Sequence, residues 1–166
     1  MDDNQKYEAA FELATRKHDG QYRKGGAPYI THPVAVSQIV KIQGYGVDYQ
    51  VTALFHDLLE DTDATETEIE EIGGKDVLEA VKLLTKTNGY VMAEYIDGIR
   101  ANDIAFAVKA ADRLHNLRSA VCANDEFKRK YILETINWYM DFSPEIGEAV
   151  HALAKTLSKP ITDLHL

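Results

Sequence analysis

The chain has 166 residues, 45% of them hydrophobic, and a formal net charge of −9. That length predicts one domain with a substantial core over residues 1–166, ending in a tail at 160–166 that frays. The negative charge argues against a nucleic-acid-binding protein, because such proteins need a basic face. The single cysteine, Cys122, excludes an intrachain disulfide framework. With no signal peptide or long apolar segment evident, we expect a cytoplasmic protein that does not bind membranes.

The sequence predicts helices almost throughout. Apolar residues at helical spacing indicate a first helix over 3–17, and a basic, Gly-rich loop follows at 18–31. Thr65 and Glu68 have the spacing of a helix capping box. Gly and Pro residues separate the later helices, which are predicted over 33–42, 47–60, 65–72, 75–84, 90–100, 103–119, 126–140 and 144–157. Few runs alternate with period two, so the expected fold class is all-α, a compact multi-helix bundle.

Residues 55–61 read Phe-His-Asp-Leu-Leu-Glu-Asp and carry the most informative pattern of the chain. On a helix, positions three and four apart share a face, so His56, Asp57, Glu60 and Asp61 would form one polar stripe. Asp57 and Asp61 repel each other one turn apart, and acids near the C-terminal end of a helix oppose its macrodipole. A bound cation would offset both effects. The alternative for these carboxylates alone is a frayed, solvated acidic helix end.

Two more residues of the metal-ligand type lie beside predicted helices elsewhere. His32 directly precedes Pro33, and proline favours the first turn of a helix. Asp112 flanks the apolar stripe of the 103–119 helix, with Asn116 one turn later on the same side. A lone His or Asp near a core is usually a satisfied structural group. Three separate segments that each end in such a residue favour a shared site instead.

The set of two histidines and two carboxylates suits a metal ion. Imidazole and carboxylate oxygen are typical ligands of borderline-to-hard divalent ions, and the absence of thiolates argues against a closed structural zinc site. Four protein ligands on an ion that prefers six leave positions for water and substrate, and a bound water becomes a nucleophile near neutral pH. The spacing does not separate manganese, iron, cobalt and zinc. The four candidate ligands are His32, His56, Asp57 and Asp112.

These residues resemble the metal ligands of the HD phosphohydrolase superfamily. Longer segments are similar to the hydrolase domain of RelA/SpoT-type alarmone enzymes: His-Asp-Gly-Gln-Tyr-Arg-Lys-Gly-Gly-Ala-Pro-Tyr-Ile-Thr-His-Pro at 18–33, Phe-His-Asp-Leu-Leu-Glu-Asp-Thr at 55–62 and Lys-Ala-Ala-Asp-Arg-Leu-His-Asn-Leu-Arg at 109–118. Leu-Thr-Lys at 84–86 also fits. The similarity runs in the family's order from about residue 7 to residue 118 and continues more weakly through the C-terminal helices.

The resemblance implies an HD-domain bundle and a standalone small alarmone hydrolase, with no room for the separate synthetase domain of the long enzymes. Such enzymes remove the 3′-pyrophosphate of guanosine tetra- and pentaphosphate, (p)ppGpp, with manganese. Other transition metals stay open. Glu60 and Asp61 match the acidic pair that orients or deprotonates the attacking water and assists the leaving group. The resemblance assigns three further residues to the nucleotide: Arg23, Lys24 and Asn116.

The sequence also departs from the family pattern. Gly25 and Gly26 follow Lys24 where the long enzymes tend to carry a small hydroxyl residue, and the stretch between Lys86 and Asn102 is shorter than in those enzymes. Two alternative functions therefore stay open. One is an HD phosphatase that acts on another phosphorylated nucleotide, and the other is a metal-containing nucleotide sensor without turnover. The intact acidic pair disfavours the sensor. The sequence does not predict an oligomeric state.

Overall fold

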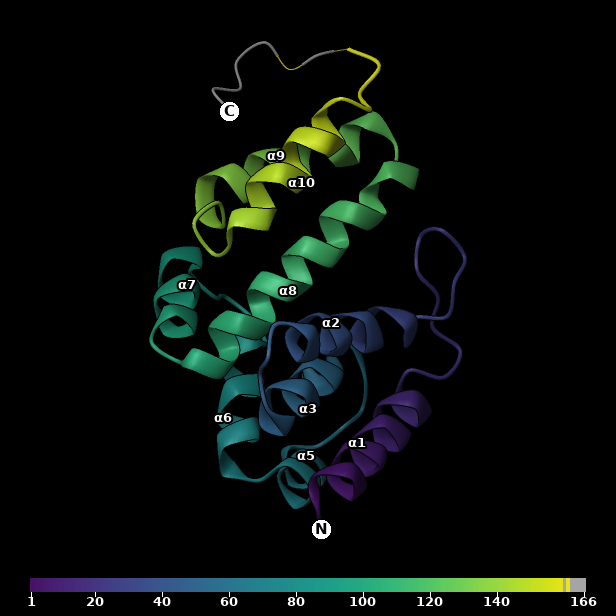
Figure 1. The fold of residues 1–166 in the computed structure, drawn as a ribbon, viewed down its shortest axis with the longest axis vertical. Helices are drawn as coiled ribbons and strands as arrows, with labels where there is room; N and C mark the ends of the chain where they lie inside the picture. The colour runs from purple at the N-terminus through teal and green to yellow at the C-terminus, as the bar shows by residue number, and fades with distance from the viewer. Residues whose placement is uncertain (160, 162–166) are drawn as a thin grey trace. The chain divides into compact units, whose positions relative to one another are not determined.

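A computed structural model describes residues 1–159 and 161, and the described chain is helical (Figure 1). The all-α prediction is confirmed: these residues form no strand, only an isolated antiparallel bridge between Tyr22 and Pro28. None of the described helices combines the length and apolar character needed to cross a membrane. The helices are α1 (Asp3–Lys17), α2 (Thr31–Ile42), α3 (Val47–Phe55), α4 (Leu58–Asp61), α5 (Glu66–Gly73), α6 (Lys75–Leu84), α7 (Met92–Arg100), α8 (Asp103–Ser119), the 3₁₀ turn η1 (Ala120–Cys122), α9 (Asp125–Trp138) and α10 (Pro144–Ala154).

The chain divides into two compact units, Met1–Ala111 and Asp112–Leu166. The boundary falls inside α8, so the first half of that helix belongs to the first unit and its second half to the second unit. The predicted fraying of residues 160–166 lies outside the described residues, apart from residue 161.

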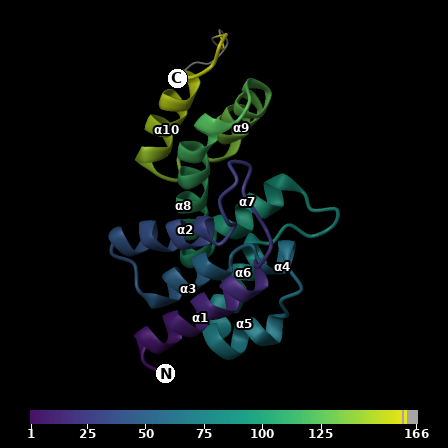
Figure 2. The same ribbon diagram turned by 90° about the vertical axis from the view of Figure 1, so that its right-hand side faces the viewer.

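The first unit is built around α3, whose last five residues are all buried. Helices α1, α2 and α6 pack against α3, and α5 packs against α6 (Figures 1 and 2). Apolar side chains from α1, α3 and α6 meet in one cluster that includes Leu13, Leu54, Phe55 and Val81. Because such interiors are close-packed, the cluster fixes the C-terminal end of α3 and the residues that follow it.

The prediction of one helix over 47–60 is wrong. The segment forms two helices, α3 and α4, and His56 and Asp57 lie in the turn between them. The carbonyl oxygen of Ala53 explains the break, because it accepts a 2.6 Å hydrogen bond from His56 Nδ1. The backbone nitrogen of His56 lies 3.5 Å from the same oxygen. A side chain therefore competes with the helical backbone pattern, and a turn, not a helical stripe, presents the histidine and the aspartate.

The other predicted helices are confirmed, with ends that shift by at most three residues. The predicted capping box is confirmed as well. Thr65 Oγ1 accepts from the backbone N–H of Glu68, and Glu68 Oε1 accepts from the backbone N–H of Thr65, over 3.1 and 3.0 Å. Gly74 alone separates α5 from α6, with φ +85° and ψ 178°. This backbone conformation is essentially restricted to glycine, so the angle between the two helices depends on it.

The second unit contains the C-terminal half of α8, η1, α9 and α10. Arg113 links α8 to α9, because its guanidinium lies 4.2 Å from the ring centroid of Tyr131 and 4.0 Å from that of Tyr139. Its Nη2 atom donates a 2.6 Å hydrogen bond to Glu134 Oε1. A planar guanidinium can stack on aromatic rings and still donate in its own plane, which an ammonium cannot do. Packing between α9 and α10 completes the unit.

Candidate metal centre

Three of the predicted metal ligands lie together in the first unit. One ligand atom each from His32, His56 and Asp57 lies within 4.8 Å of the other two. Both histidines are buried and the aspartate is half-buried. His32 comes from the first turn of α2, as the following proline indicated, and the other two come from the turn between α3 and α4. Packing of α2 against α3 brings the two segments side by side.

His56 is oriented so that one ring nitrogen faces Asp57. Its Nδ1 atom must carry the proton, because the partner is the carbonyl oxygen of Ala53. In the neutral imidazole the lone pair is therefore on Nε2, the atom that lies 3.0 Å from Asp57 Oδ2. When two ligand atoms each lie about 2.1 Å from one metal ion and their bonds to it form a right angle, the two atoms are about 3 Å apart. The spacing and the fixed tautomer thus fit two neighbouring ligands of one divalent ion.

The two histidine rings meet edge to face. The ring centroids of His32 and His56 are 5.2 Å apart with an interplanar angle of 69°. His32 exposes only 2% of its surface. Two buried imidazoles beside a carboxylate form a mixed nitrogen and oxygen donor set, which fits a divalent metal ion.

Tyr29, from the loop before α2, contacts this cluster, and the sequence predicted no role for it. Tyr29 Oη donates a 2.5 Å hydrogen bond to Asp57 Oδ2. The ring of Tyr29 lies 4.8 Å from that of His18 and 5.9 Å from that of His32, centroid to centroid. The contact with Asp57 joins residues 28 positions apart. No local spacing could have predicted it.

His18 is almost fully buried beside the cluster. Its Nδ1 atom lies 2.8 Å from Gln21 Oε1, and among the described residues its Nε2 atom has no hydrogen-bond partner. Burial lowers the pKa of His18 below its ordinary value, with smaller contributions in the same direction from the charges of His56 and His32. Hydrogen bonding to Gln21 and the charge of Asp57 act in the opposite direction. The net effect favours a neutral imidazole.

The predicted acidic pair lies on α4, one turn beyond the aspartate of the cluster. Glu60 Oε1 accepts a 2.5 Å hydrogen bond from the backbone N–H of Lys86, which fixes this carboxylate in place. The pKa of Asp61 is raised to about 6, mainly by burial and then by the negative charges of Asp57 and Glu60. Asp61 as a whole is nevertheless exposed, so solvent screens part of this effect.

The predicted nucleotide-binding residues fall in both units. In the first unit, Arg23 is half-buried and Lys24 exposed, in the loop before α2. A turn holds their backbone, in which the N–H of Arg23 donates to the carbonyl oxygen of Ala27 over 2.8 Å. In the second unit, Asn116 lies on α8 one turn after the predicted metal ligand Asp112, which is buried. Asn116 Nδ2 donates a 3.2 Å hydrogen bond to Asp112 Oδ1. The predicted same-side placement of these two residues is therefore confirmed.

Two lysines place positive charge beside the ring of Tyr95. Lys86 Nζ lies 5.5 Å and Lys109 Nζ 5.7 Å from the centroid of the Tyr95 ring. The ring is itself fixed by a 2.8 Å hydrogen bond from its hydroxyl to the carbonyl oxygen of Leu84. Both lysines belong to segments that carry the family resemblance.

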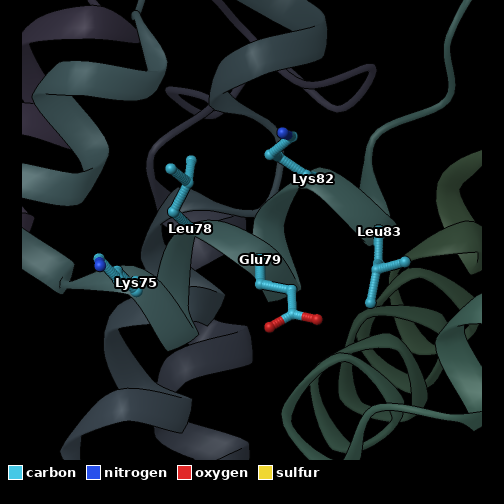
Figure 3. Close-up of a pocket in the computed structure, with 5 residues that line it drawn as sticks. All are labelled: Lys75, Leu78, Glu79, Lys82 and Leu83. Carbon is cyan, nitrogen blue, oxygen red and sulfur yellow. The ribbon is translucent and has the colours of Figure 1, made fainter.

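A separate hollow of about 350 Å³ lies along α6 (Figure 3). Charged and apolar side chains of α6 both line it, and none of the predicted site residues is among those that line it in the described chain. The lining residues are Lys75, Leu78, Glu79, Lys82 and Leu83.

Comparison with known proteins identifies the family of the chain. The family model described as HD domain matches residues 10–147. The chain belongs to the HD-domain family. The matched region includes every residue that we assigned to the metal, the acidic pair and the nucleotide.

Curated relatives are similar over most of the chain. The chain is 32% identical over 149 residues to the bifunctional (p)ppGpp synthase/hydrolase SpoT of Escherichia coli (strain K12), and 34% identical over 148 residues to a guanosine-3′,5′-bis(diphosphate) 3′-pyrophosphohydrolase of Aquifex aeolicus (strain VF5). Each match covers 83% of this chain and 21% of the relative. The chain therefore spans about a fifth of the length of these HD-domain relatives.

A solved structure supports the HD fold. It is described as a metazoan ortholog of SpoT that hydrolyses ppGpp, and it matches with a TM-score of 0.69. The match covers 89% of this chain and 94% of that chain, at 24% sequence identity. The HD-domain arrangement of helices is thus shared with a protein whose sequence has diverged widely.

Proposed function

We propose that this HD-domain protein hydrolyses the 3′-pyrophosphate of (p)ppGpp, giving GDP or GTP and diphosphate. The observation that carries the proposal is the cluster of His32, His56 and Asp57, with two carboxylates one turn beyond it. The names of the relatives, which include pyrophosphohydrolases of this alarmone, support the choice of substrate.

The metal ion that we propose is Mn²⁺, held by His32, His56 and Asp57, with Asp112 as a fourth ligand. The mixed donor set supports a divalent ion of intermediate hardness, and the sequence resemblance supports manganese and the fourth ligand. When bound, such an ion lowers the pKa of a coordinated water and offsets negative charge on phosphoryl oxygens. His56 is prepared for this role, because Ala53 fixes its tautomer.

The acidic pair would move the protons of the reaction. Glu60 lies in a fixed position through its hydrogen bond from Lys86, and we assign to it the orientation of the attacking water. Asp61 has a raised pKa and can therefore hold a proton near neutral pH more readily than an ordinary aspartate. That property suits a group that gives a proton to the departing diphosphate.

We propose that positive side chains hold the nucleotide. Arg23 can lie flat on a purine, since its guanidinium is planar, while Lys24 acts as a point charge on a phosphate. On the basis of the family resemblance, we propose that Asn116 is a further contact to the nucleotide. A protein with a net charge of −9 needs such local positive charge to bind a polyanionic substrate.

We also propose that the protein acts in the cytoplasm, as one HD domain, on a small nucleotide and without nucleic acid as a partner. The overall negative charge supports the last point. A family model that extends across residues 10–147 supports the single domain.

The test is to incubate the purified protein with Mn²⁺ and guanosine 3′-diphosphate 5′-diphosphate and to identify the products. Release of GDP and diphosphate is expected. Release of orthophosphate would instead indicate a phosphatase, and tight binding of the nucleotide without turnover would indicate a sensor. A parallel sample with excess chelator should show no product, which separates metal-dependent hydrolysis from a contaminating activity.

A further inference from the structure

We infer that Tyr29 is a positioning residue of the metal centre, which holds the carboxylate of Asp57 in the orientation that binds the metal. The inference rests on the proposed metal-dependent function. Its basis is the 2.5 Å hydrogen bond from Tyr29 Oη to Asp57 Oδ2. The accepting oxygen is the same atom that lies 3.0 Å from His56 Nε2. The phenol therefore acts on the oxygen that faces the neighbouring ligand.

The tyrosine ring itself packs against two histidine rings. Its centroid lies 4.8 Å from that of His18, at an interplanar angle of 46°, and 5.9 Å from that of His32, at 64°. His18 is buried, and its hydrogen bond to Gln21 fixes its ring. The hydroxyl of Tyr29 thus reaches Asp57 from a ring with little freedom to turn, so the hydrogen bond imposes a direction on the carboxylate.

A hydrogen bond from a phenol to a carboxylate is charge-assisted and stronger than one between neutral groups. Asp57 is only half-buried and lies in a turn, outside regular helix, so its side chain has more than one rotamer available. Selecting the metal-binding rotamer before the ion arrives reduces the entropy lost on binding. Partners of this kind typically contribute about 10–100-fold to metal affinity.

The same hydrogen bond connects the metal centre to the basic loop. Tyr29 lies near the end of this loop, and Gln21 near its start donates from Nε2 to the carbonyl oxygen of Asp61 over 2.9 Å. The backbone N–H of Tyr29 also donates to the carbonyl oxygen of Gln21 over 2.8 Å, which closes the loop. Arg23 and Lys24 lie between these two anchors. We therefore expect metal binding to help place the two cations that hold the nucleotide.

The experiment compares Tyr29→Phe with the wild-type protein in a titration with Mn²⁺ alone, without nucleotide. The substitution removes the hydroxyl and keeps the ring, so the packing against His18 is retained. The Kd for Mn²⁺ is expected to rise by about 10–100-fold. Tyr22→Phe is the matched control, because Tyr22 is 68% exposed in the same loop. Its Kd should equal that of the wild type.

Thermal unfolding in excess chelator will show whether Tyr29→Phe keeps the fold. A further measurement is turnover at rising Mn²⁺, which should recover most of the wild-type kcat, because the defect lies in metal affinity. Equal Kd values for Tyr29→Phe and the wild type would overturn the inference while leaving the proposed hydrolysis intact. Mn²⁺ binding by the wild type without turnover of (p)ppGpp would overturn the proposed function and leave the effect on affinity measurable.

Discussion

At the residue scale, the candidate site joins residues that were predicted from the sequence to others that were not. His32, His56 and Asp57 were predicted as neighbours and lie within reach of one ion. Tyr29 and His18 were not assigned a role, because their contacts depend on how the loop before α2 folds back. Residue type and spacing indicated which groups could share one metal ion. They did not indicate which groups orient those ligands.

Glu60→Gln is expected to slow hydrolysis by roughly 10²–10⁴-fold, the usual size of a general acid–base effect, while Mn²⁺ affinity changes little. The amide oxygen can still accept from the backbone N–H of Lys86, so the fold around α4 is retained. Single-turnover kinetics with saturating nucleotide will measure the chemical step. A rate near that of the wild type would mean that another group handles the proton.

Asp61→Asn is expected to stabilise the metal-free protein at pH 7. The pKa of Asp61 is about 6 in the folded protein and close to 3.8 when unfolded, so the folded state binds the proton more tightly. Its contribution to stability is therefore present below about pH 4 and is lost as the pH rises through about 6. Asn mimics the protonated form and avoids this loss.

The gain from Asp61→Asn should be about 1 kcal/mol or less, because solvent screens an exposed carboxylate. It should be largest above pH 6 and vanish near pH 4. Urea unfolding with excess chelator across this range will measure it. A gain that grows towards low pH would show that the pKa is not raised.

At the element scale, the sequence predicted where helices lie better than where one of them breaks. The 47–60 segment has helical periodicity throughout, yet it divides into α3 and α4. The cause is a side-chain hydrogen bond to the carbonyl of Ala53, which hydrophobic spacing cannot reveal. Capping is more local, and the Thr65 capping box was therefore predictable from two residues. The observed helix ends differ from the predicted ends by a few residues at most, as is usual for helix boundaries.

Gly74→Ala is expected to destabilise the protein by about 1–3 kcal/mol, because a side chain at φ +85° and ψ 178° strains the backbone between α5 and α6. A Cβ atom at this position would meet nothing within 4 Å, so the cost comes from the backbone and not from a clash. Urea unfolding will measure it.

Gly25→Ala provides the comparison for Gly74→Ala. Gly25 lies in the exposed basic loop, and a Cβ atom there also has open space around it. Its stability should stay within about 0.5 kcal/mol of the wild type. Equal effects of the two substitutions would mean that the backbone at Gly74 carries no special strain.

At the scale of the whole molecule, the all-α HD fold was predictable because motif and periodicity agree along the chain. The division into two units inside α8 was not, since the sequence shows no linker there. A continuous helical stripe over 103–119 gives no sign of a boundary. The second unit begins at the predicted ligand Asp112 and includes the predicted nucleotide contact Asn116. The assignment of both residues continues to rest on the family resemblance.

Asp112→Asn is expected to raise the Kd for Mn²⁺ by more than roughly 100-fold. Losing a residue that only orients a ligand can cost about that factor, and here the ligand itself is removed. Asp103→Asn, an exposed acid at the start of the same helix, is the control and should bind Mn²⁺ normally. Calorimetric titration will provide both Kd values. Unchanged affinity in Asp112→Asn would limit the protein ligands to those of the first unit.

The hydrogen bond between Glu60 and the backbone of Lys86 also bears on how members of this family can vary in length. It involves the first residue of the stretch between Lys86 and Asn102, and it uses no side-chain atom of the lysine. Insertions or deletions after that position can therefore accumulate without displacing the carboxylate. A single residue added or lost between the end of α6 and Lys86 would shift the anchoring amide, and natural variants should tolerate length changes on one side of it only.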